Sequence, residues 1–165
     1  MNITFQEAAW FLPFVLPICL YVSWTDLRDM RITNYSVLAL FAVFAVGGLF
    51  LLPLEVYGWR MLALALVLVA GFVITSLGMV GAGDAKFAAA MAPFVAQGDG
   101  LFFVTLFAMV LIGSWITHRS AGRIPAVRRA TPDWVSWERG KLFPMGVALS
   151  GALVIYLVMG LGLWA

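Results

Sequence analysis

Two aspartates are the residues of this chain best placed to perform chemistry, because each lies at the edge of a strongly apolar segment. Asp84 belongs to the run GAGDAK at residues 81–86, and Asp26 follows the first apolar segment. An acid at the edge of a hydrocarbon layer is costly in free energy, so its presence there indicates a functional site. Gly81 and Gly83 beside it expose the backbone and leave room for another chain to approach closely.

Two carboxylates brought within a few ångströms cannot both ionise cheaply, so they share a proton and titrate as a pair. The ionised partner takes a proton from water while the protonated partner donates to a scissile carbonyl, as in aspartic proteases. This chemistry needs no metal, cofactor or nucleophilic side chain, and it suits a chain whose only histidine is His118 and only cysteine is Cys19. From spacing alone, a second interpretation stays open, in which Asp26 and Asp84 are solvated or paired with nearby bases.

The composition places these acids in a membrane protein. The chain has 165 residues, of which 64% are hydrophobic and 11% charged, and a mean hydropathy of +1.02. A soluble domain of this length could not bury so much apolar surface. The net charge of +2 is modest, and the bases are not interleaved with the polar surface that a nucleic-acid binder needs.

Charge-free windows divide the chain into six apolar segments. A helix needs about 20 apolar residues to cross the hydrocarbon core, and only the segment after Asp84 is clearly shorter. If that segment also crosses, every lysine and arginine except Arg60 lies on one side, which the positive-inside rule identifies as cytoplasmic. We therefore predict a single all-α domain over 1–165, with both termini outside, a cytoplasmic loop over 118–141 and six spans at about 8–25, 32–54, 61–83, 84–98, 100–117 and 142–165.

Several local predictions follow from this topology. A helix over 84–98 would be only about 22 Å long, which draws Asp84 below the headgroups. The sequence around Asp99 predicts a tight turn on the outer side, where Asp99, Glu7 and Glu55 are expected to be solvated. In the polar loop, Thr131-Pro132-Asp133 resembles a helix start, which would place Trp134 and Trp137 on one face of a helix lying on the membrane surface.

Three motifs, in order along the chain, resemble those of type IV prepilin peptidases. The run 81–86 is similar to that family's Gly-x-Gly-Asp-x-Lys motif, and FPMG at 143–146 resembles the Pro-x-Gly stretch that opens its last span. The run DLRDMRITN at 26–34 resembles the first acidic motif, with Thr33 where the family usually has proline before Asn34.

The resemblance implies a GxGD-type aspartic endopeptidase that removes the leader of pilin precursors at the cytoplasmic face of the bacterial inner membrane. It assigns Asp26 and Asp84 as the catalytic pair, without metal or cofactor, and makes Gly81, Gly83, Lys86 and Asn34 supporting or substrate-binding residues. The longer family members carry a cytoplasmic insertion with paired cysteines that methylates the new pilin terminus. This chain has neither, so it resembles the short branch that serves Flp-type (tight-adherence) pili, and we expect no methyltransferase activity.

Two other functions are compatible with the residues. A proton-coupled transporter subunit also uses acids within the membrane, although it predicts further acids deep in the spans. A non-catalytic assembly protein of a pilus or secretion machine would need no acid pair at all. Lys86 likewise has two interpretations, as a ligand for a substrate carboxylate or as a cytoplasmic anchor.

Overall fold

The computed structural model describes residues 1–140 and 142–162, and all regular secondary structure within them is helical. Lys141 and residues 163–165, which belong to the predicted loop and last span, lie outside the described residues. The elements are α1 (Phe5–Asp29), α2 (Asn34–Leu51), α3 (Leu54–Ser76), α4 (Ala82–Met91), η1 (Ala92–Phe94), α5 (Gly100–Ala121), α6 (Pro125–Ala130), η2 (Val135–Trp137) and α7 (Met145–Gly160).

Four of these helices, α1, α2, α3 and α5, are long and apolar enough to cross a membrane. The helix α7 is apolar but has 16 residues, and α4 has only 10 before η1 tightens its end at Pro93. The short fourth segment of the sequence prediction is therefore a short helix in the structure. An integral membrane helical protein is the architecture that these lengths support.

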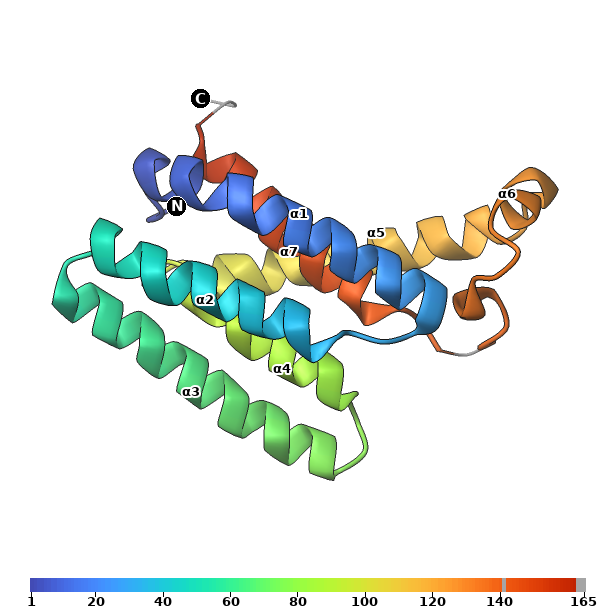
Figure 1. Cartoon of the computed structure of the whole chain (residues 1–165), viewed down its shortest axis with the longest axis horizontal. Helices are drawn as coiled ribbons and strands as arrows, with labels where there is room; N and C mark the ends of the chain where they lie inside the picture. Colours follow the sequence, from blue (N-terminus) through green and yellow to red (C-terminus); the bar gives the residue numbers. More distant parts are fainter. Residues whose placement is uncertain (141, 163–165) are drawn as a thin grey trace.

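Successive long helices run in opposite directions, so the bundle has two distinct ends (Figure 1). Both termini lie at one end, together with the links from α2 to α3 and from α4 to α5. The links from α1 to α2, from α3 to α4 and from α5 to α7 lie at the other. The helix α1 packs mainly on α7 and α2, α3 on α4, and α5 on α7.

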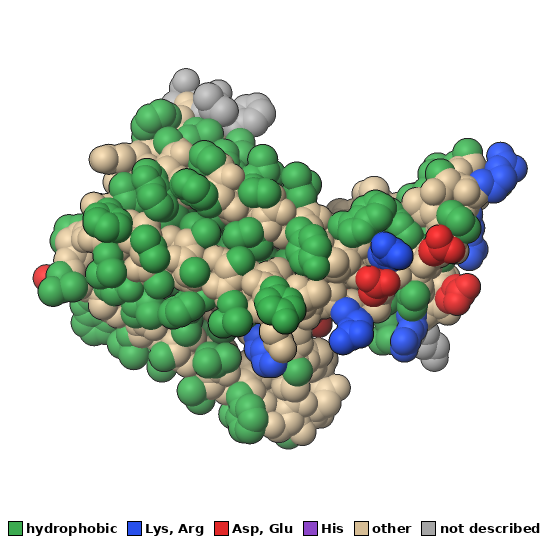
Figure 2. All heavy atoms as spheres, in the orientation of Figure 1, with side chains coloured by type: hydrophobic (Ala, Val, Ile, Leu, Met, Phe, Trp, Pro, Cys, Tyr) green, Lys and Arg blue, Asp and Glu red, His purple; other side chains and the backbone are tan. Residues whose placement is uncertain are grey.

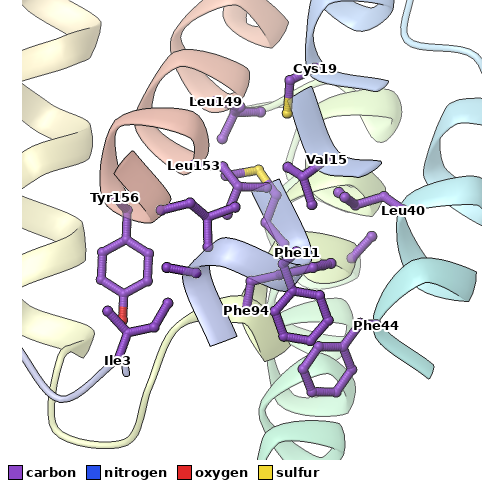
Figure 3. Close-up of a cluster of buried hydrophobic side chains, with 14 of the residues drawn as sticks. Ile3, Phe11, Val15, Cys19, Leu40, Phe44, Phe94, Leu149, Leu153 and Tyr156 are labelled. Atoms are coloured by element: carbon purple, nitrogen blue, oxygen red, sulfur yellow. The ribbon is translucent and has the colours of Figure 1, made fainter. Parts of the chain in front are cut away.

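An aromatic cluster forms the centre of the core (Figure 3). The rings of Phe11, Phe44 and Phe94 are fully buried, with ring centroids 5.0 to 5.7 Å apart. These rings come from α1, α2 and η1. Their packing therefore fixes η1, the turn with Pro93 that follows the short helix α4. The visible surface of the bundle is apolar, whereas charged side chains gather at the end that carries α6 (Figure 2). This distribution is typical of a protein whose sides face lipid.

The prediction that Glu7 and Asp99 are solvated is wrong. Glu7 is 7% exposed and forms a 3.0 Å ion pair with the buried Arg60 on α3. Asp99 is 3% exposed and accepts hydrogen bonds from the backbone N–H of Asn2 at 2.8 Å and from the Tyr156 hydroxyl at 2.7 Å. Each acid is buried because a fixed donor replaces its water. Glu55 is exposed, as predicted.

The burial of Arg60 also explains an error in the third span. Charge-free windows place this span at 61–83, whereas α3 begins at Leu54 and ends at Ser76. The predicted span starts after Arg60 because a charge-free window places every charged residue outside the membrane, whereas Arg60 is buried and paired with Glu7. The residues after α3 leave the helix instead, with Gly78 at φ +72°, a conformation that glycine adopts without strain.

The predicted helix start at Thr131-Pro132-Asp133 is also wrong. The helix α6 ends at Ala130, and the next helical turn is the short η2. The Thr131 hydroxyl donates to the Val127 carbonyl at 2.8 Å and accepts from the Trp137 indole N–H at 3.0 Å, so it closes the preceding helix instead of capping a new one. Trp134 and Trp137 do stack on each other, at 5.6 Å.

Candidate active site

Asp26 lies in the last turn of α1, where the helix ends at Met30 in the left-handed conformation. Its side chain is 5% exposed, and its Oδ2 accepts a 2.6 Å hydrogen bond from the backbone N–H of Gly146. Gly146 is the second residue of α7, so the carboxylate sits at a helix N-terminus, where unpaired N–H groups and the helix dipole favour negative charge. The start of α7 therefore holds Asp26 in place.

Gly146 contacts the acid so closely that only glycine fits there. A Cβ added to Gly146 would lie 2.9 Å from Oδ2 of Asp26 and 3.1 Å from Cδ1 of Ile32. The sequence analysis included this glycine in a motif but gave it no role. Its spacing after Pro144 was the available signal, and nothing in the sequence connected it with Asp26.

Asp84 lies in the first turn of α4 and is half-buried. The helix begins after Gly81, and a Cβ on that glycine would lie 2.7 Å from Oδ2 of Asp84. Gly83 is also closely packed, with its Cβ position 3.3 Å from Cβ of Ile32. The two glycines of the 81–86 run thus leave room for the acid on one side and for the link between α1 and α2 on the other.

The structure brings Asp26 and Asp84 to the same end of the bundle, on either side of Ile32. The Ile32 side chain meets Gly83, next to Asp84, and also Gly146, which binds Asp26. Ile32 is thus the residue that lies next to both acid-bearing segments. Both residues are described, and no hydrogen bond joins their carboxyl groups in this conformation.

Neither acid is neutralised by an ion pair among the described residues. The two ion pairs there are Glu7 with Arg60 at 3.0 Å and Asp29 with Arg28 at 3.8 Å. Asp29 therefore has a neighbouring arginine as its partner, whereas Asp26 and Asp84 have none in the described part of the chain. Asp26 is therefore buried and Asp84 half-buried without a neutralising base among the described residues.

An open cleft of about 660 Å³ reaches Asp84. Its walls come from the link before α4, from α5 and from the start of α7, and they include Met79, Leu111, Trp115, Phe143 and Met145. Asp26 does not line this cleft, but Met145 does, immediately before the glycine that binds Asp26. In this conformation Asp84 lines the open cleft, whereas Asp26 is buried and does not line it.

The two remaining supporting residues contact each other rather than either acid. Lys86 donates a 3.3 Å hydrogen bond from Nζ to Oδ1 of Asn34, which connects α4 with the start of α2. Both side chains are at the surface. Their roles in substrate binding stay a prediction.

The cleft has a neighbouring aromatic cluster that the sequence analysis did not anticipate. His118 at the end of α5 stacks on Trp137 at 4.6 Å and meets Phe143, a cleft residue, edge-on at 5.8 Å. Trp24 on α1 contacts Trp134 at 5.8 Å. The polar loop therefore folds back beside the site. Within the described part of the chain, no three His, Cys, Asp or Glu residues lie close enough together to hold a metal ion.

Comparison with known proteins matches the chain to one family. The model of the type IV leader peptidase family matches residues 14–117, which is more than half of the chain and includes both aspartates. The matched segment ends before Gly146. No curated protein and no solved structure matched the chain.

Proposed function

Because the chain belongs to the type IV leader peptidase family, we propose that it is a membrane-embedded aspartic endopeptidase that removes the leader from Flp-type pilin precursors. The observation that supports this proposal best is the meeting of Asp26 and Asp84 around Ile32, with Asp84 open to a cleft. Two carboxyl groups at one end of the bundle, one of them beside an open cleft, suit acid–base hydrolysis of a peptide bond.

In the proposed reaction, the pair holds one proton and positions a water molecule beside the peptide carbonyl. The ionised carboxylate removes a proton from this water as its oxygen attacks the carbonyl carbon, and the protonated carboxyl gives its proton to the carbonyl oxygen. When the carbon–nitrogen bond breaks, the carboxyl group that took the water proton gives it to the leaving nitrogen. One hydroxyl of the tetrahedral intermediate returns its proton to the other carboxylate as the new carboxyl group forms, so the pair again holds one proton. No metal or cofactor takes part.

We place the acid end of the bundle at the cytoplasmic face of the bacterial inner membrane, with six crossings and both termini outside. The alternating direction of the helices and the common position of the termini support this arrangement (Figure 1). The charged side chains that gather beside α6 support the orientation, because lysine and arginine accumulate on the cytoplasmic side. In this orientation α4 and α7 are short crossings buried against longer helices.

The substrate assignment rests on the size of the cytoplasmic loop and on the cysteine count. After α5 ends at Ala121, the described residues before α7 hold the six-residue α6 and the short η2, and the chain has a single cysteine, which is buried in α1. We therefore propose cleavage without methylation of the new terminus.

A transporter subunit is the less favoured alternative, because it would need exchangeable acids deep in the bundle. The buried acids beyond the candidate pair are Glu7 and Asp99, and both are held by fixed donors at the opposite end. Such acids stabilise packing and are not free to carry protons.

The test uses asparagine variants, which keep side-chain size but remove ionisation. Membranes containing Asp26→Asn or Asp84→Asn, together with a Flp-type precursor, should accumulate uncut precursor while the variant remains inserted. Asp29→Asn is the matched control, since Asp29 is an exposed acid in the same turn region and is paired with Arg28. It should cleave normally. Normal cleavage by both Asp26→Asn and Asp84→Asn would exclude the proposal.

A further inference from the structure

Three neighbouring cavities with shared lining residues form a row, here called the groove, that starts at Asp84 and runs toward the other end of the bundle. The cleft at the acid end shares Val80, Asp84 and Met145 with a second cavity of about 250 Å³. That cavity shares Val67, Ala88 and Leu149 with a third, of about 400 Å³. The groove is thus continuous with the candidate active site.

Two helices that pack on different partners form the walls of this groove. The helix α3 packs mainly on α4 and η1, and α5 packs mainly on α7, so the space between α3 and α5 is left to the groove. On α3 the lining extends from Trp59 to Ile74, which is about 22 Å at 1.5 Å per residue. This length is about three quarters of the hydrocarbon core of a bilayer.

The lining of the groove is mostly apolar, with Arg60 and Gln97 at the end away from Asp84, and the floor of its middle cavity is made of small side chains. In the middle cavity, Asp84 is the only residue with a polar side chain among those that line it. The floor there is formed by Ala85 and Ala88 of α4. Gly71 of α3 packs so closely on Ala85 that a Cβ added to the glycine would lie 3.0 Å from the Cβ of Ala85. Small residues let a helix backbone approach closely, which is how helices associate within lipid.

An occupant of this groove has to come from the membrane, because the walls are apolar and the exposed faces of α3 and α5 are those of lipid-facing helices. A lipid acyl chain would fill the apolar part of the groove, but it has no polar group that would interact with Asp84. A helix that lies along the groove would bring the residues at its end to Asp84, where the open cleft begins. Continuity with the acid therefore favours a helix.

We propose that the groove between α3 and α5 binds the apolar transmembrane helix of the precursor, entering sideways from the bilayer. This inference rests on the proposed peptidase function and adds the place where the substrate lies. The helix packs against Ala85 and Ala88, and the chain unwinds at its cytoplasmic end to present the scissile bond to Asp84. The leader then occupies the wider cleft beside Met79 and Phe143.

Cysteine cross-linking tests the position of the helix without requiring cleavage. Ala70 on α3 is exposed and lines the groove, whereas Ala65 on the same helix is exposed and lines none of the three cavities. In the Asp26→Asn background, Ala70→Cys or Ala65→Cys is combined with a precursor that carries one cysteine in its apolar segment. The native Cys19 is buried in α1 and is common to both variants.

We expect a disulfide adduct with the precursor at position 70 and little or none at position 65. Equal adducts at the two positions would overturn the proposal, and so would an adduct between two copies of the Ala70→Cys chain without precursor, which would identify a second copy as the occupant. If the Ala70→Cys variant forms the adduct but the wild-type chain cuts no precursor, the groove is supported and the peptidase function is refuted. If the wild-type chain cuts the precursor but the Ala70→Cys variant forms no adduct, the peptidase function is supported and the groove is refuted.

A second measurement uses steric block in the active enzyme. Ala70→Trp fills the groove, so cleavage of the membrane-anchored precursor at low concentration should fall about tenfold or more, the equivalent of about 1.4 kcal/mol of lost binding. Ala65→Trp adds the same volume on the lipid face and should cleave at the wild-type rate. Wild-type cleavage by Ala70→Trp would mean that only lipid fills the groove, and the inference would then fail.

Discussion

Replacing Gly146 with alanine tests whether the backbone of α7 positions Asp26. The added Cβ would lie 2.9 Å from Oδ2 and 3.1 Å from Cβ of Asp26, closer than real Cβ contacts normally come. Ile32 blocks the other side at 3.1 Å. The carboxyl group therefore has to move, and its 2.6 Å hydrogen bond from the Gly146 N–H is lengthened or lost.

The size of the effect follows from these distances. A displacement of about 1 Å in a catalytic group can lower the rate about a hundredfold. Loss of a hydrogen bond to a charged group costs about 1.5–3 kcal/mol, while alanine in place of a helical glycine returns about 1 kcal/mol of helix propensity. We therefore expect a large fall in kcat with a net loss of stability of about 0.5–2 kcal/mol.

The assay compares precursor cleavage with thermal unfolding in the same detergent. Gly113→Ala is the matched control, because Gly113 is also helical and a Cβ there meets nothing within 4 Å. It should keep full activity and gain slightly in stability. Cleavage by Gly146→Ala at the wild-type rate would refute the reasoning that α7 holds Asp26 in its working position.

Three further predictions concern the rest of the bundle and the chemistry. Arg60→Met leaves Glu7 buried without its partner, so the free energy of unfolding should fall by about 3–5 kcal/mol, against no measurable change for the exposed Arg128→Met. An unchanged unfolding midpoint would contradict the buried ion pair. Tyr156→Phe removes the hydroxyl that donates to Asp99 and accepts from the Ala96 N–H, and should cost about 1–3 kcal/mol in the same measurement, whereas Tyr35→Phe at an exposed position should cost nothing. Precursor cleavage should be unaffected by a chelator, since a carboxylate pair needs no metal; activity lost with chelator and restored by a divalent cation would count against the mechanism.

The sequence predicted the acid end of the fold better than the opposite end. Asp26 and Asp84 could be selected as candidate site residues because each lies at the edge of a long apolar segment. Such positions can be recognised from the sequence alone. Their meeting depends on the direction of each helix, which the alternation of charge-free segments also indicates. The all-helical membrane architecture followed from the same pattern.

The buried polar contacts could not be predicted, because each depends on a partner far away in the sequence. Glu7 and Arg60 are 53 residues apart, and Asp99 and Tyr156 are 57 residues apart. A window of hydropathy treats each of these residues as exposed, which misplaced the start of α3 and made two acids look solvated. Gly146 was missed for the same reason, since its partner Asp26 is 120 residues away.

The helix expected at Thr131 failed for a local reason. The Thr131 hydroxyl can accept a hydrogen bond from the backbone N–H groups that follow, as an N-cap, or it can donate one to a carbonyl of the preceding helix. The carbonyl of Val127 and the indole of Trp137 satisfy it in the second way. Competition of this kind is common for threonine, and short motifs do not decide it.

The uneven distribution of buried polar contacts has a mechanical consequence. At the end with the termini, Arg60 joins α3 to α1 and to the carbonyls of η1, while Asp99 and Tyr156 join α7 to the start of the chain. At the acid end, the polar side-chain contacts that connect helices of the described bundle are the buried hydrogen bond from Gly146 to Asp26 and the surface contact of Lys86 with Asn34. Side-chain hydrogen bonds and an ion pair thus join the helices more extensively at the end with the start of the chain. A small tilt of α5 and α7 about that end would displace the acid end most.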